Sequence, residues 1–200
     1  MPRQGLSRAQ VVDAAAKIAD AEGLDSVTVA RVASQLGIKA PSLYNHVAGR
    51  DDLLAALGVR ALRELTAALT QASMGRSRDD ALQGIAAAYR GYVLEHPGLY
   101  AATIRAPEPE DRERLETAES LLAVVYAVLA GYGLEGDDAV HAARALRSGL
   151  HGFASIEAAG GFAIPADRDE SFRRMVAALA AGLEAPPRSA GPRARPGSST

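Results

Sequence analysis

Apolar residues recur every three or four positions along almost the whole chain, and this spacing constrains the fold more than any other feature. It gives a helix one apolar face, whereas a half-buried strand needs strict alternation. No stretch alternates β-branched and polar residues as strands do. We therefore expect an all-α chain. Glycines and prolines divide it into about nine helices, over residues 7–23, 26–37, 40–47, 51–73, 79–95, 97–105, 109–131, 136–159 and 169–184.

The first three predicted helices are short and have clear boundary signals. Ser7 and Thr28 are of the residue types that cap helix N-termini. Gly37 can take the left-handed conformation between the second and third helices. Pro41 lies in the first turn of the third, where its missing N–H costs nothing. Helices of this length joined by a glycine-centred turn predict a helix-turn-helix domain over residues 1–50.

The rest of the chain divides into two parts. Residues 51–184 have enough helical pattern and apolar content for a second, all-helical domain. From residue 185 onward the sequence APPRSAGPRARPGSST has no apolar periodicity and is dominated by Pro, Gly, Ser and Arg. We predict that this tail, residues 185–200, is disordered.

Composition excludes several classes of protein. The sequence has no Cys, which excludes thiolate metal sites and cysteine nucleophiles. No apolar run approaches the ~20 residues that span a membrane. Met1 is not followed by a signal-peptide core. We expect a cytoplasmic protein with no membrane partner.

Basic residues are concentrated near the predicted helix-turn-helix. Between Val27 and Arg50 the charged residues are Arg31, Lys39 and Arg50, and no acid occurs, although the whole chain has a net charge of −2. A local basic face on a mildly acidic body fits a protein that binds DNA with one end. A solvated helical surface remains an alternative explanation.

The third predicted helix presents polar groups outward. At 100° per residue, Leu43 and Val47 share its inner face. A helix of this width fits the major groove of DNA, where Ser42 and Asn45 can bond base edges. Lys39 can reach a guanine or a phosphate. Three further side chains can contact the DNA backbone: Tyr44, His46 and Arg50.

The run TVARVASQLGIKAPSLYNHVAGRDDLLAAL resembles the DNA-binding domain of the tetracycline-repressor (TetR) family over about residues 7–60. The resemblance implies a homodimeric transcriptional regulator, usually a repressor, that binds a pseudo-palindromic operator. It implies phosphate contacts from Thr28, Tyr44, His46 and Arg50. It implies base reading by Lys39, Ala40, Ser42 and Asn45. Lysine is the commoner residue at the position of Arg50, a departure that should preserve the contact.

The C-terminal part resembles a TetR subgroup marked by a Trp-His-Gly triplet, which here is Leu150-His151-Gly152 and lacks the tryptophan. The resemblance implies a domain that dimerises through helices 136–159 and 169–184 and binds a small-molecule effector. Each candidate lining residue could instead serve only in packing, and His151 could be a core or interface histidine. The candidate lining is Tyr89, Tyr92, Tyr100, Thr103, Tyr126, His151 and Phe153.

Enzymatic interpretations find little support in the sequence. Asp138 and His141 have a spacing that can bind metal, but a helical di-iron site needs a second such pair and further carboxylates. No glycine-rich phosphate loop or hydrolase motif occurs. We expect no metal, no cofactor and no enzymatic activity. Two alternatives remain: a DNA-binding regulator without an effector, and a helical enzyme or carrier with a vestigial helix-turn-helix.

Overall fold

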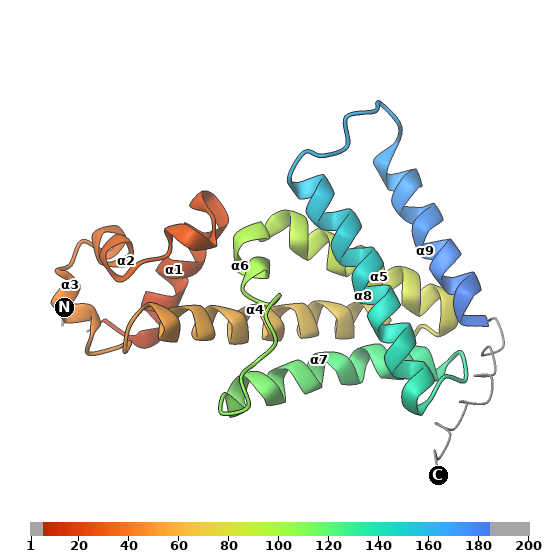
Figure 1. Ribbon diagram of the computed structural model, residues 1–200, viewed down its shortest axis with the longest axis horizontal. Helices are drawn as coiled ribbons and strands as arrows, with labels where there is room; N and C mark the ends of the chain where they lie inside the picture. The colour runs from red at the N-terminus through yellow and green to blue at the C-terminus, as the bar shows by residue number, and fades with distance from the viewer. Residues whose placement is uncertain (1–5, 185–200) are drawn as a thin grey trace, which may run out of the picture.

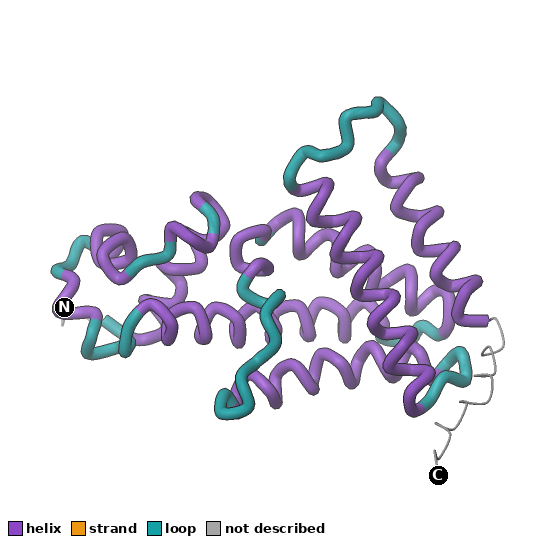
Figure 2. Tube along the Cα trace, viewed as in Figure 1, coloured by secondary structure: helices purple, strands orange, loops and turns teal. Residues whose placement is uncertain are grey.

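The protein was analysed as a computed structural model that describes residues 6–184, and the regular structure in this range is entirely helical (Figures 1 and 2). The fold-class prediction is therefore confirmed. The predicted disordered tail lies outside the described residues. The proposed division into domains at residue 50 stays a prediction.

The elements follow one another along the chain as nine α-helices and one 3-10 turn within residues 6–184. In Figure 1, α1, α2 and α3 form a group at one end of the long helix α4. Helices α5, α6 and α7 lie against the rest of α4, and α8 and α9 pack on α5. The N-terminal elements are α1 (Arg8–Glu22), η1 (Leu24–Ser26), α2 (Val29–Leu36) and α3 (Ala40–Leu43). The others are α4 (Arg50–Ser73), α5 (Arg78–Glu95), α6 (Pro97–Ala101), α7 (Arg112–Ala130), α8 (Gly136–Ala158) and α9 (Arg168–Glu184).

The boundaries of the first two helices follow from their caps. The Ser7 side chain accepts a hydrogen bond from the Gln10 backbone, and the Gln10 side chain accepts one from the Ser7 backbone, which is a reciprocal capping box. Thr28 Oγ1 accepts from the backbone N–H of Arg31 at 3.1 Å. Gly37 has φ 66° and ψ 29° at the end of α2. The predictions for Ser7, Thr28 and Gly37 are confirmed.

The third helix is shorter than the sequence predicts. Helical structure was expected over residues 40–47, but α3 ends at Leu43 and a turn follows. Side chains from α1 and α4 bond backbone groups in this turn. Arg8 Nη1 donates to the carbonyl of His46 at 2.8 Å, and the N–H of Ala48 donates to Asp52 Oδ2 at 2.8 Å. The helix expected over 97–105 likewise ends early, at Ala101.

Helix α4 is the central element, with α5 and α7 packed along it. Its buried residues include Leu57 and Leu65. At Gly58 a Cβ atom would lie 3.1 Å from the guanidinium carbon of Arg114, so the absence of a side chain lets this arginine cross the helix. Arg114 Nη2 donates to the carbonyls of Ala102 and Arg105, each at 2.8 Å. Arg114 thereby fixes the segment between α6 and α7 against α4.

Helices α1 and α6 meet at backbone contact. A Cβ atom at Gly98 would lie 1.8 Å from the carbonyl oxygen of Ala19, so only glycine permits this approach. Asp20 secures the contact, because its Oδ1 accepts from the Leu99 N–H at 2.7 Å and its Oδ2 lies 3.0 Å from His96 Nδ1. The N-terminal helices are therefore joined to the rest of the chain through α6 as well as through α4.

Candidate DNA interface and small-molecule site

The outer arc of α3 and the turn after it is exposed. Leu43 and Val47 are buried, as the helical spacing predicts, whereas Ser42 and Asn45 are exposed and Tyr44 is 60% exposed. Lys39 is also exposed, and Ala40 is partly buried. The side chains expected to reach base edges therefore lie on the outside of the domain. Their contact with DNA stays a prediction.

The side chains predicted to contact phosphates have different surroundings. Thr28 is exposed at the start of α2, where its hydroxyl oxygen already caps the helix. His46 is partly buried. Arg50 Nε donates to the carbonyl of Val27 at 2.9 Å, and its Nη2 lies 3.7 Å from Asp25 Oδ1. Arg50 therefore also ties the start of α4 to the segment before α2.

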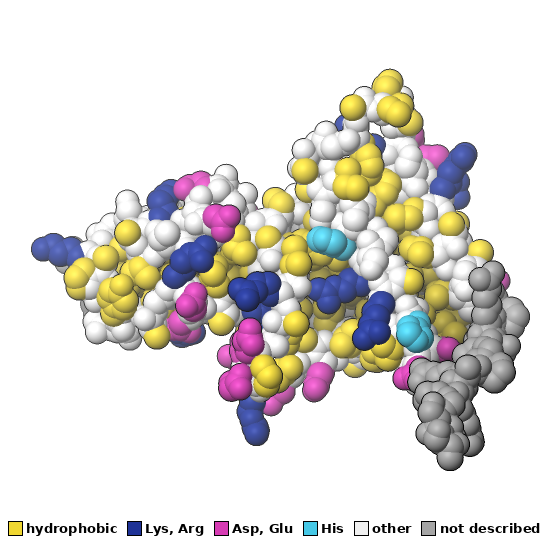
Figure 3. Space-filling view, in the orientation of Figure 1, with side chains coloured by type: hydrophobic (Ala, Val, Ile, Leu, Met, Phe, Trp, Pro, Cys, Tyr) yellow, Lys and Arg dark blue, Asp and Glu magenta, His cyan; other side chains and the backbone are white. Residues whose placement is uncertain are grey.

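Fewer basic side chains near the helix-turn-helix lack an acidic partner than the sequence suggests. Arg31 forms a two-point contact with Glu22 at 2.5 and 3.1 Å. Arg8 forms one with Asp52 at 2.6 and 2.9 Å. Lys39 has no carboxylate oxygen within 4 Å in the described part of the chain. Figure 3 shows basic and acidic side chains side by side at this end of the molecule.

Three of the predicted lining residues form one hydrogen-bonded chain in the C-terminal part. The hydroxyls of Tyr89 and Tyr100 lie 2.5 Å apart, and the Tyr100 hydroxyl lies 2.7 Å from His151 Nδ1. Ser155, which sequence reasoning missed, extends the chain with its hydroxyl 3.1 Å from the same nitrogen. Its position four residues after His151 was the available signal. Helices α5, α6 and α8 thus meet through polar side chains.

The other predicted lining residues lie apart from this chain or at its edge. Thr103 is buried, and its carbonyl lies 3.5 Å from Nη2 of Arg147, another residue that the sequence analysis missed. Tyr92 turns to α4, where its hydroxyl donates to Glu64 at 3.0 Å. Phe153 packs against Phe162 and Phe172. Tyr126 is partly buried on α7.

Burial raises the pKa of both joined phenols. It raises the pKa of Tyr89 and is the main cause that raises the pKa of Tyr100. The hydrogen bond from Tyr89 and the charge of Arg147 partly offset this effect at Tyr100. Both phenols are therefore protonated at neutral pH and can donate hydrogen bonds.

Two open grooves lie elsewhere on the described surface, and none of the seven predicted lining residues lines either. One, of 330 Å³, lies between α8 and α9 and includes Leu146 and Leu179. The other, of 720 Å³, lies where α1 and α4 meet the start of α7 and is rich in charged side chains, such as Arg60 and Glu113. Within residues 6–184, no group of three or more His, Cys, Asp or Glu side chains is placed to hold a metal ion. No helix in the same range is long and apolar enough to cross a membrane.

Two family models match the chain. Residues 11–57 match the model for bacterial regulatory proteins of the tetR family. Residues 82–179 match the model for the C-terminal domain of tetracyclin repressor-like proteins. The two matches cover the helix-turn-helix region and most of the helices after α4. Assignment to the Trp-His-Gly subgroup stays a prediction.

Relatives and solved structures agree with these matches. The chain is 43% identical over 180 residues to an uncharacterized HTH-type transcriptional regulator of Mycobacterium tuberculosis, Rv0681, covering 90% of this chain and 82% of that one. It superposes with a TM-score of 0.68 and 24% identity on BioQ, solved with its double-stranded DNA operator, over 90% of this chain and 99% of that one. A TetR variant from Acinetobacter baumannii in complex with minocycline gives a TM-score of 0.69 at 24% identity, over 90% and 97% of the two chains. At these identities the solved structures establish the likeness of fold.

Proposed function

The chain belongs to the TetR family of helix-turn-helix transcriptional regulators, and from this membership we propose that it represses transcription as a homodimer on a pseudo-palindromic operator. A small molecule bound in residues 51–184 would release it. The observation that carries the DNA-binding part is the geometry of α3. Leu43 and Val47 anchor the segment from inside, and Ser42 and Asn45 face outward. BioQ, a protein of the same fold, has been solved with its operator.

In the proposed complex, α3 lies in the major groove and the flanking residues hold the backbone. Ser42 and Asn45 can donate to and accept from base edges, and Lys39 adds a positive charge that has no acidic partner in the described residues. Ala40 offers a methyl group to the groove. The phosphate contacts would come from Thr28, Tyr44, His46 and Arg50. Arg50 would exchange its 3.7 Å neighbour Asp25 for a phosphate oxygen.

Dimerisation would use α8 and α9. One reading head of four helical residues gives little affinity, whereas two heads at a fixed spacing read a palindrome. The groove between α8 and α9 is lined mainly by small and aliphatic residues, which suit close packing of helices. At Gly149 on α8, a Cβ atom would lie 3.0 Å from Cδ1 of Leu179 on α9, so these two helices already approach closely.

The effector would act through α6. Tyr100 in this helix bonds His151 of α8, and the preceding residue, Leu99, bonds Asp20 of α1. A ligand that moved the Tyr100 side chain would therefore displace a helix that touches the DNA-binding head. Such a ligand shifts the equilibrium only if it binds the released state more tightly than the DNA-competent one.

One observation favours the alternative, a regulator with no small-molecule effector. The hydroxyls of Tyr89 and Tyr100 bond each other rather than facing an open cavity, and neither residue lines either of the two grooves. The two proposals differ in a direct measurement. Operator binding that does not respond to any compound in a broad metabolite panel would support the alternative.

The DNA-binding part is tested by gel shift with DNA flanking the gene of this protein. We expect a shift that Asn45→Ala weakens about tenfold or more on the operator, with little change on unrelated DNA. Equal loss on both DNAs would remove Asn45 from the base-reading residues. The absence of a shift on every genomic fragment would overturn the regulator itself.

A further inference from the structure

One face of α8 carries polar side chains at helical spacing. Intervals of three or four residues place them on the same side of the helix. The face is turned toward α6, because His151 Nδ1 lies 2.7 Å from the Tyr100 hydroxyl and Arg147 Nη2 lies 3.5 Å from the Thr103 carbonyl. In chain order its members are Arg144, Arg147, His151 and Ser155.

His151 Nδ1 lies within hydrogen-bond distance of two hydroxyl groups. Nδ1 is shared by the hydroxyls of Tyr100, at 2.7 Å, and Ser155, at 3.1 Å. Both hydroxyls can donate, and Tyr89 can in turn donate to Tyr100. In the tautomer in which Nδ1 accepts from Tyr100, the ring hydrogen lies on Nε2. Within residues 6–184, no acceptor bonds Nε2, so this N–H is a donor without a partner.

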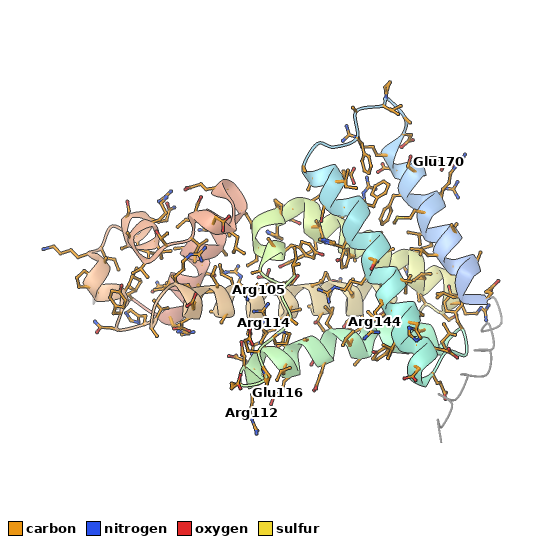
Figure 4. The ribbon with its side chains drawn as sticks, viewed as in Figure 1. Arg105, Arg112, Arg114, Glu116, Arg144 and Glu170 are labelled. Carbon is orange, nitrogen blue, oxygen red and sulfur yellow. The ribbon has the colours of Figure 1, made fainter. Side chains whose placement is uncertain are left out.

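Arginines near this face also have no carboxylate partner. In the described residues no acidic oxygen lies within 4 Å of the guanidinium groups of Arg105, Arg114, Arg144 or Arg147. By contrast, Arg90 on the neighbouring helix α5 pairs with both Glu157 and Asp169. Figure 4 shows Arg105 and Arg114 beside the segment that crosses α4, with Arg144 on α8. Figure 3 shows basic side chains and histidines over the middle of the viewed surface of the molecule, and acidic side chains toward its edges.

The arrangement is complementary to an anion. Arg147 is exposed, and its positive charge acts on the hydroxyl of Tyr100 strongly enough to offset part of the effect of burial on that pKa. It lies one helical turn from the free N–H of His151. A guanidinium matches a carboxylate in shape, and a hydrogen bond between charged groups is about twice as strong as a neutral one. A positive charge and a hydrogen-bond donor without a carboxylate partner in the described residues are complementary to a bound anion.

We propose that the effector is a carboxylate-bearing small molecule, held by the guanidinium of Arg147 and by Nε2–H of His151. This inference rests on the proposed function, because it names the chemical class of the molecule that the C-terminal part binds. A single carboxylate carries one negative charge, which the guanidinium balances. Its two oxygens can accept one hydrogen bond from the guanidinium and one from Nε2–H. Binding there would pull on the bond between His151 and Tyr100, which is the connection to α6.

The test compares acids with their neutral amides on the full-length protein by calorimetry. The probes are benzoate, phenylacetate and octanoate, paired with benzamide, phenylacetamide and octanamide. We expect at least one acid to bind tenfold or more tightly than its amide, the typical gain from a charge-assisted hydrogen bond. Arg147→Gln should weaken acid binding more than amide binding and so reduce this preference to less than about threefold. Arg112→Gln, which alters an exposed arginine at the start of α7, is the control and should retain the full preference.

The proposal is overturned if no acid exceeds its amide, or if the preference survives in Arg147→Gln. Fluorescence anisotropy with the operator, run on the same samples, separates this failure from failure of the proposed function. Amides that release DNA as well as the acids do would leave the effector role intact and remove the anion site. An acid that binds through Arg147 without releasing DNA would leave the anion site and remove the effector role.

Discussion

The carboxylate of Asp20 in α1 accepts a hydrogen bond from the backbone N–H of Leu99 in α6 over 2.7 Å. The same side chain bonds His96, and it is only 22% exposed. Asp20→Ala leaves both partners without an acceptor, and we expect it to lower the free energy of unfolding by about 1–2 kcal/mol. Asp20→Asn retains an acceptor for Leu99 and should lose less. Urea unfolding measures both, with Glu119→Ala on the exposed side of α7 as the control. A loss in Asp20→Ala no larger than in the control would contradict the structural role of this contact.

Two glycines in neighbouring helices should respond in opposite directions to alanine. At Gly98 the new Cβ would lie 1.8 Å from the carbonyl oxygen of Ala19, so the backbone must move, and we expect a loss of about 3 kcal/mol or more. At Gly91, in α5, a Cβ meets nothing within 4 Å, and alanine should stabilise the helix by about 0.5–1 kcal/mol. Thermal unfolding of the two variants provides the comparison. A Gly98→Ala protein as stable as the parent would show that α1 and α6 do not touch at this point.

The salt dependence of operator binding should depend on Lys39. If Lys39 contacts a phosphate, Lys39→Gln should reduce the slope of log affinity against log salt by about 0.9 per protomer. The sequence has one other lysine, Lys17 on α1, and Lys17→Gln serves as the matched control with an expected slope equal to that of the parent. Anisotropy titrations between about 50 and 200 mM salt give the slopes. If the Lys39→Gln slope matches that of the parent while affinity falls, the residue reads a base instead.

Acid should weaken the connection between α1 and α4. The hydrogen bond from Arg8 is the main cause that lowers the pKa of Asp52 to about 2; the Ala48 N–H and the charge of Arg8 lower it further, and burial opposes them. Because the pKa is lower in the folded state, the stabilisation is fully present above the unfolded pKa of about 4 and is lost as the pH falls through about 2. Screening limits the effect to about 1 kcal/mol. Asp52→Asn should remove this part of the pH dependence, as urea midpoints between pH 5 and 2 would show. A parent-like pH profile in Asp52→Asn would contradict it.

Local signals were sufficient to predict the helices of the DNA-binding head. Ser7, Thr28 and Gly37 act within a few residues of their own position, and each was confirmed as a residue that bounds a helix. The length of α3 could not be predicted in this way. It depends on Arg8 and Asp52, whose side chains satisfy the backbone at His46 and Ala48 after the chain has folded.

The sequence identified which residue types lie at the functional surfaces, but it did not show which residues would pair with one another. The sequence identified the basic residues near the head. Their acidic partners lie before the acid-free stretch: Glu22 pairs with Arg31, and Asp25 lies beside Arg50. The composition of the stretch alone could not reveal these pairs. The tyrosines on α5 illustrate the same limit. Tyr89 and Tyr92 are three residues apart, but the first faces α6 and the second faces α4. That difference is set by packing and not by spacing.

The close approach of Gly98 to Ala19 has a consequence for hybrid regulators. Exchanging DNA-binding heads between relatives is a way to give a sensor a new target gene. In this protein the contact between the head and the C-terminal part includes Gly98 of α6, which packs against the backbone of α1, and Asp20 of α1, which accepts a hydrogen bond from the next residue of α6. A transplanted head would need a small residue at position 19 and an acceptor at position 20 to seat against α6. If the proposed coupling through α6 holds, we expect a head without them to bind its operator but not to respond to the effector of the new sensor.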